Sequence, residues 1–127
     1  MNSKKFGPYL WHTMFIIAMN YPAKVDTRTK EGMREARQYK RYFYSYKNML
    51  PCGHCRESYA AMTRALPIDD YLGSRRNLVY WLYLIHDLVN KKLYCQKMEA
   101  TGKKSDPHAV TSPSFSKVYK YYDSFRA

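Results

Sequence analysis

The spacing of apolar residues is the feature of this sequence that most restricts its fold. In the second quarter of the chain they recur every three or four positions, at Tyr39, Tyr42, Phe43, Tyr46 and Leu50. That interval places side chains on one side of an α-helix, whereas a half-buried β-strand would alternate apolar and polar residues. Alternation of that kind is absent from the chain. We therefore expect a fold made of helices alone.

Proline, glycine and capping residues divide the chain into five predicted helices. Their expected ranges are 8–21, about 27–50, 52–65, 75–93 and 113–125. Pro8 is expected to open the first helix, Asp26 or Thr27 to cap the second, Ser74 to cap the fourth and Ser112 to cap the fifth. Residues 95–112 are polar, contain Gly102 and Pro107, and are predicted to form a loop. The expected fold class is all-α, a four-helix bundle plus a short fifth helix, in a single domain spanning residues 1–127.

The chain is strongly basic, with 22 Lys and Arg against 10 Asp and Glu and a formal net charge of +12. The basic residues are scattered and match no nucleic-acid-binding motif, so we expect a solvated basic surface and no nucleic-acid partner. The longest apolar run, 78–85, is far shorter than the roughly 20 residues that span a membrane. No secretory cleavage site follows the apolar stretch near the N-terminus, so a cytoplasmic protein without membrane association is expected.

Three cysteines are present, and two of them form the motif Cys52-Gly53-His54-Cys55 directly after Pro51. At a helix N-terminus the helix dipole stabilises the thiolate of the first cysteine, and a protonated His54 would add to this effect. Thiol–disulfide exchange is the predicted chemistry. Two alternatives stay open: a zinc site completed by other Cys or His residues, and a flavin-free isomerase with a thioredoxin fold. Cys95 is expected to be an unpaired buried thiol, or otherwise a relay or a link between subunits.

The fourth predicted helix carries His86 and Asn90, which lie four residues apart and therefore share a face. Such a pair can hydrogen-bond the edge of a base or ring, and the neighbouring Lys91 and Lys92 can bind phosphates. A single histidine on an apolar helix can equally be a satisfied core residue. No glycine-rich phosphate loop is present, so a nucleotide would have to be held between helices.

Three segments in order resemble the Erv/ALR sulfhydryl oxidases, especially compact members encoded by large DNA viruses. They are Gly7 and Trp11 with Tyr21-Pro22, the LPCxxCR segment at 50–56, and WxxxxHxxVNxxL at 81–93. The resemblance implies a usually dimeric helical bundle that holds FAD among its helices, oxidises a protein dithiol and reduces oxygen to hydrogen peroxide. A thioredoxin-like carrier is one expected source of that dithiol. For a viral protein it also implies the host cytoplasm or the virus assembly site, and it leaves packaging into virions open.

The resemblance also implies roles for individual residues. Cys55 would be the cysteine next to the flavin, and Cys52 the outer sulfur that exchanges with substrate. The implied cofactor-binding residues are Gly7, Trp11, Phe15, Cys55, His86, Asp87, Val89, Asn90, Lys91, Lys92 and Tyr122.

The chain also departs from the family pattern. Phe15 stands where the family often has histidine, with His12 nearby, and Asp87 replaces an asparagine. Tyr83 and Phe115 occupy the positions of a structural disulfide in cellular members, so we expect an aromatic contact there. The tyrosine-rich second helix is expected as a surface for the dimer partner.

Overall fold

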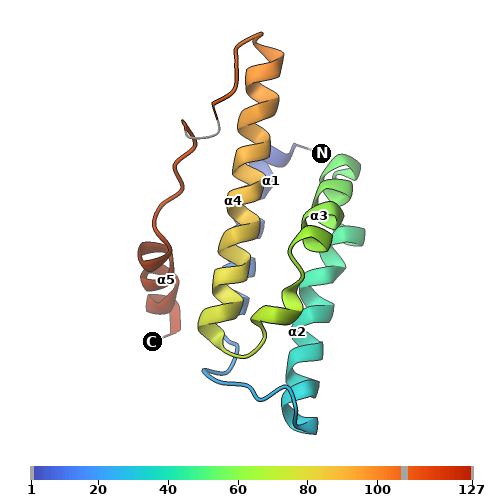
Figure 1. Cartoon of the computed structure of the whole chain (residues 1–127), viewed down its shortest axis with the longest axis vertical. Helices are drawn as coiled ribbons and strands as arrows, with labels where there is room; N and C mark the ends of the chain where they lie inside the picture. Colours follow the sequence, from blue (N-terminus) through green and yellow to red (C-terminus); the bar gives the residue numbers. More distant parts are fainter. Residues whose placement is uncertain (1, 107–108, 127) are drawn as a thin grey trace.

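The computed structural model describes residues 2–106 and 109–126, and within them the chain forms a helical bundle (Figure 1). The long helix α4 (Arg75–Ala100) lies at the centre of this view and partly hides α1 (Ser3–Ala18). α2 (Lys30–Met49) and α3 (Gly53–Ala65) pair on one side of α4, and the short α5 (Phe115–Asp123) lies on the other. Single 3-10 turns, η1 (Ile68–Tyr71) and η3 (Ser124–Arg126), precede α4 and follow α5. The prediction of a four-helix bundle with a short fifth helix is confirmed.

The first helix begins earlier than predicted. Asn2 caps α1, with its side-chain oxygen accepting a hydrogen bond from the Lys4 N–H at 3.0 Å. Pro8 lies inside the helix, where it removes one backbone donor without ending it. The expectation that Pro8 opens the helix was wrong because the Asn2 cap, six residues upstream, already satisfies an N-terminal donor.

The second helix begins after Thr29, two to three residues later than predicted. The Thr29 hydroxyl accepts a hydrogen bond from the Gly32 N–H at 3.0 Å, while the Asp26 carboxylate binds the exposed Arg28. Gly32 is required here, because a Cβ at this position would lie 1.9 Å from the Asp26 carbonyl oxygen. Asp26 and Thr27 therefore belong to the loop that the glycine allows to approach α2.

The fourth helix runs seven residues further than predicted, to Ala100. The polarity of residues 94–100 suggested a loop, but these residues include good helix formers and no glycine or proline. The terminator is Gly102, which has a positive φ of 70°. The fifth helix is capped by Ser114, whose hydroxyl accepts from the Lys117 N–H, and not by Ser112 as predicted.

The first part of α4 supplies more core residues than any other element. Trp81 is fully buried and donates its indole N–H to the Leu66 carbonyl at 2.9 Å, and Tyr21 donates its hydroxyl to the Leu72 carbonyl at 2.7 Å. Four tyrosines of α2 pack against this core, half-buried: Tyr39, Tyr42, Tyr44 and Tyr46. They contribute to the core of the single chain, and the expectation that this helix also forms a partner surface stays a prediction.

Tyr83 and Phe115 meet as predicted, and their contact fastens α5 to α4. Their rings lie 5.6 Å apart at 62°, and the Tyr83 hydroxyl donates to the Pro113 carbonyl at 2.6 Å. The Phe115 ring also contacts Tyr80 and the guanidinium of Arg76. None of the helices in the described part of the chain combines the length and hydropathy needed to cross a membrane.

Candidate active site at the CxxC corner

The CxxC motif lies at the corner where α2 passes into α3. Cys52 is the N-cap residue of α3, with an extended backbone, and its Sγ accepts a hydrogen bond from the Cys55 N–H at 3.3 Å. The Arg56 guanidinium donates to the Leu50 carbonyl and closes the corner. Cys52 and Cys55 are half-buried free thiols. The pair therefore lies at the positive end of a helix, as predicted.

The surroundings of the two sulfurs separate their pKa values. The pKa of Cys52 is lowered from its usual 9.0, first by the hydrogen bond from the Cys55 thiol and then by the Cys55 backbone N–H. The pKa of Cys55 is raised, first by burial and then by Cys52, while Lys92 acts in the opposite direction. Cys52 is consequently the sulfur that carries the thiolate in the dithiol, and Cys55 is the inner thiol.

The side chain of His54, which was expected to stabilise the Cys52 thiolate when protonated, contacts α4. Its imidazole lies 3.1 Å from the side-chain amide of Gln96 on α4. The contribution of His54 to the lowered Cys52 pKa comes from its backbone N–H. Gln96 was missed in the sequence because it lies beyond the predicted end of the fourth helix; a longer helix would have placed it one turn after Lys92.

His86 lies at the centre of an aromatic cluster between α1 and α4. Its ring is 4.4 Å from Trp11, edge-on at 81°, and 6.2 Å from Phe15. Asn90 reaches the His86 Nδ1 at 3.5 Å, the long limit of a hydrogen bond. Burial lowers the pKa of His86 below 6.5, so its ring is neutral at pH 7. Trp11, His86 and Asn90 are thus brought together as predicted.

Phe15 and Tyr122, which the resemblance places on the cofactor, are buried behind His86. Their rings stack at 4.7 Å and 9°, and the Tyr122 hydroxyl lies 2.8 Å from Nδ1 of His12. His12 therefore ties α1 to α5. Its contact with Tyr122 was not predicted, since the two are 110 residues apart.

The neighbouring lysines of α4 have different partners. Lys91 forms an ion pair with Asp87 at 2.9 Å, and Asp87 also accepts a hydrogen bond from Ser112 at 2.6 Å. Lys92 lines a groove of about 320 Å³ on α3 together with His54, Glu57, Ser58, Ala61 and Met62. Of the two predicted phosphate ligands, only Lys92 lies on the side of the dithiol.

Gly7 and Val89 are half-buried. A Cβ added at Gly7 would meet no other atom within 4 Å. Val89 follows Ile85 by four residues and so continues the inward face of α4 towards the CxxC end. Cys95 is free and half-buried on α4, where a buried thiol was expected.

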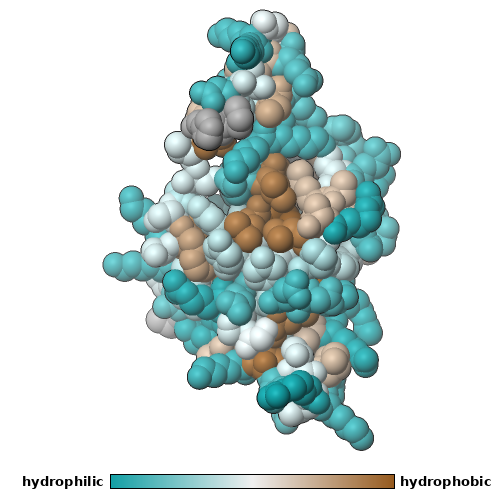
Figure 2. Space-filling model, viewed as in Figure 1, coloured by the Kyte–Doolittle hydropathy of each residue, from teal (hydrophilic) through white to brown (hydrophobic). Residues whose placement is uncertain are grey.

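The bundle is incompletely packed at its CxxC end. Neither α1 before Met14 nor α4 after Ile85 contains a fully buried residue, although both helices are described in full. Leu93, eight residues after Ile85, is 53% exposed. Figure 2 shows hydrophobic atoms at the surface between α4 and α3. A flat apolar ring system would find an aromatic partner in Trp11 and an amide in Asn90, while Lys92 provides a cation on the side of α4 that faces α3, so these residues fit a flavin.

The structure offers little to the two alternatives for the CxxC pair. Residues 2–106 and 109–126 contain no group of three or more Cys, His, Asp or Glu close enough to hold a metal ion, as a zinc site would require. Extended pairing in the same residues is limited to an isolated bridge between Lys24 and Ser74. The parallel sheet on which a thioredoxin-fold isomerase depends is therefore missing from the described chain.

Comparison with known proteins agrees with this geometry. The sequence model of the Erv1 / Alr family matches residues 8–109. The chain is 34% identical over 119 residues to the "Probable FAD-linked sulfhydryl oxidase" of Acanthamoeba polyphaga mimivirus, covering 88% of this chain and 79% of the relative. It is 26% identical over 111 residues to the FAD-linked sulfhydryl oxidase ERV1 of Oryza sativa subsp. japonica. That match covers 84% of this chain but only 53% of the rice protein.

A solved structure shares the fold. The yeast Erv1 core superposes with a TM-score of 0.63 at 24% identity, over 73% of this chain and 72% of that one. The family match extends over most of the helical bundle and includes both the CxxC corner and the His86 helix. The chain belongs to the Erv1/Alr family.

Proposed function

We propose that this chain is an FAD-linked sulfhydryl oxidase that forms disulfides in a partner protein. The family and the names of both relatives support this activity. The observation that carries the proposal is the pairing of Cys52, whose pKa is lowered, with Cys55, whose pKa is raised by burial, beside an incompletely packed end of the bundle. This arrangement gives an outer sulfur for exchange and an inner sulfur facing the helices.

The exchange step follows from the positions of the two sulfurs. In the oxidised enzyme, a thiolate of the partner attacks Sγ of Cys52, the Cys52–Cys55 bond breaks, and its electron pair leaves on Cys55. The partner's second thiol then attacks the partner sulfur of the mixed disulfide and releases Cys52. The partner loses two electrons and two protons, and the Cys52/Cys55 pair gains them.

Lys92 assists the departure of Cys55. Its positive charge lowers the pKa of the Cys55 thiol, and a lower pKa makes a better leaving group. Lys91 does not share this role, because it is paired with Asp87 and does not influence the pKa of Cys55.

Three half-buried residues of α1 and α4 would hold FAD beside this pair: Trp11 by ring contact, and His86 and Asn90 by hydrogen bonds. The neutral ring of His86 offers both a donor and an acceptor nitrogen. When bound, FAD supplies the two-electron acceptor that regenerates the disulfide and the site at which oxygen is reduced to hydrogen peroxide. Trp11 and His86 touch each other edge-on, so each fixes the orientation of the other.

The test uses the purified full chain. A flavin absorption spectrum and oxygen uptake with dithiothreitol are expected. Cys52→Ser and Cys55→Ser should each abolish oxygen uptake and keep the spectrum, whereas Cys95→Ser serves as the control and should keep both. A colourless protein that reshuffles disulfides without consuming oxygen would overturn the proposal and favour the isomerase.

We further propose that the active form is a homodimer formed through α1. Tyr9, Thr13 and Ile16 recur at helical spacing on its exposed side, and Tyr9 is 77% and Ile16 41% exposed. Sedimentation of the wild type as a dimer, and of Tyr9→Lys/Ile16→Lys as a folded monomer, would support it. A dimer unaffected by both substitutions would refute the α1 interface.

A further inference from the structure

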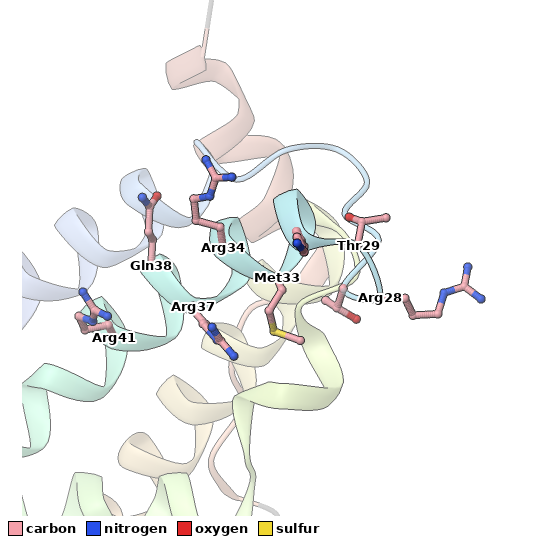
Figure 3. A pocket seen from close by; sticks show the side chains of 9 residues that line it. Arg28, Thr29, Met33, Arg34, Arg37, Gln38 and Arg41 are labelled. Carbon is pink, nitrogen blue, oxygen red and sulfur yellow. The ribbon is translucent and has the colours of Figure 1, made fainter.

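A second groove lies along the first half of α2, the half of this helix that is further from the CxxC corner. It has a volume of about 650 Å³ and is lined by residues 27–30, Met33, Arg34, Arg37, Gln38 and Arg41 (Figure 3). Figure 3 shows the side chains of Arg34, Arg37 and Arg41 extending from α2 into open space. The proposed oxidase chemistry uses none of these residues.

Four cations form a single stripe on this part of α2: Lys30, Arg34, Arg37 and Arg41, named here the α2 stripe. Their spacing of four, three and four residues keeps them on one face of the helix, over about 16 Å at 1.5 Å per residue. All four are exposed. The acidic residues of the same half-helix, Glu31 and Glu35, fall on a different side by the same periodicity.

The α2 stripe is not neutralised within the described chain. The four ion pairs there involve other cations, namely Arg28, Lys40, Lys91 and Arg126. Like charges three and four residues apart repel each other along a helix, so the stripe weakens α2 unless an anionic partner covers it. Arginine also binds carboxylates through two parallel hydrogen bonds, which lysine cannot do.

We propose that the α2 stripe binds an acidic helical segment of a partner protein. Carboxylates repeated at four, three and four residues on such a helix would match the stripe over its full length. Between the cations the groove presents Met33, which is 39% exposed, and Gln38, which suit the methylene groups and amides of a peptide. The lining contains no aromatic residue on which nucleic-acid bases could stack. A second copy of the chain is disfavoured, because a twofold axis would bring two cationic stripes together.

The position of the stripe gives this binding a use in the proposed reaction, and that use rests on the proposed function. The stripe occupies the start of α2, and the CxxC corner follows the end of the same helix. From Arg41 to Cys52 is about 16 Å if the rise of the helix is continued. A partner held on the stripe would keep its own dithiol within reach of Cys52 without covering it.

A binding assay that needs no flavin or turnover tests the surface. The probe is a fluorescein-labelled, alanine-rich peptide with Glu at positions 1, 5, 8 and 12, and the matched peptide carries Gln there. The test variant is Arg34→Gln/Arg37→Gln/Arg41→Gln. The control variant, Lys97→Gln/Lys103→Gln/Lys104→Gln, removes the same charge from exposed positions elsewhere. Circular dichroism verifies that both variants keep their helix content.

We expect fluorescence anisotropy to show binding of the Glu peptide only, weakening as salt is added. The stripe variant should bind at least tenfold more weakly, about 1.4 kcal/mol, and the control variant less than twofold more weakly. If both variants lost the same affinity for the Glu peptide, binding would depend only on the net charge of the protein, and the proposal would be overturned. If the wild type did not bind the Glu peptide but bound a 12-base-pair DNA duplex, and if the stripe variant no longer bound that duplex, the α2 stripe would be a nucleic-acid-binding surface and the proposal would be overturned. Oxygen uptake with dithiothreitol tests the oxidase separately, since that small thiol needs no docking surface.

Discussion

Removing the Tyr83 ring should detach α5 from α4 and measurably destabilise the fold. In Tyr83→Ala the ring contact with Phe115 is lost, which is worth about 0.5–1.5 kcal/mol. The hydrogen bond to the Pro113 carbonyl adds about 0.5–1.5 kcal/mol. Together these predict a loss of about 2 kcal/mol in the free energy of unfolding. For a chain of this size that corresponds to a fall in Tm of roughly 8 °C.

Urea denaturation followed by circular dichroism measures this loss, and two variants divide it. Tyr83→Phe keeps the ring and should lose about 1 kcal/mol, the share of the hydroxyl. Met49→Ala is the control, because Met49 is 74% exposed, and should stay within about 0.5 kcal/mol of the wild type. If Tyr83→Ala were as stable as Met49→Ala, the aromatic contact could not be what replaces a disulfide at this junction.

Three further predictions concern charges near the site. Alkylation of Cys52 by iodoacetamide should reach half its maximal rate below pH 9.0 and that of Cys55 above it, as mass spectrometry at graded pH would show; a reversed order would contradict the assignment of outer and inner sulfurs. Lys92→Gln should slow oxidation of dithiothreitol by up to about fivefold, the effect of roughly 1 kcal/mol between exposed charges, whereas Lys91→Gln should leave the rate unchanged. Burial opposes ionisation of Asp87, but its hydrogen bonds from Ser112 and Lys91 prevail and lower its pKa, so its contribution to stability is present above pH 3.8 and is lost as the pH falls through the lower folded value. Asp87→Asn should flatten the fall in Tm between pH 5 and pH 2, and an unchanged acid profile would show that the carboxylate does not stabilise the fold.

Local sequence signals were sufficient for the elements and for the CxxC corner. Pro51 follows an unbroken apolar stripe and precedes Cys52, so the end of one helix and the start of the next were fixed within a few residues. The same reasoning failed at residues 94–100, because polarity reports exposure and not helix termination. Only Gly102, with its positive φ, ends that helix.

Long-range contacts explain what the sequence did not reveal about the site. Ser112 and Ser114 are equivalent as capping candidates, and the choice between them depends on Asp87, which engages Ser112 from 25 residues away. Lys91 and Lys92 are likewise indistinguishable until their neighbours on α3 and in the C-terminal segment are known. Helical periodicity alone did bring His86 and Asn90 to one face.

The end of tight packing at Ile85 implies that the two halves of the bundle depend on different things for rigidity. The half around Trp81 is sealed by the chain's own side chains, and it should resist proteases whether or not cells are short of riboflavin. The other half would be completed by bound FAD, so its resistance to proteases should rise as more of the protein binds FAD. Vitamin supply would then determine how long the chain survives as well as how fast it works.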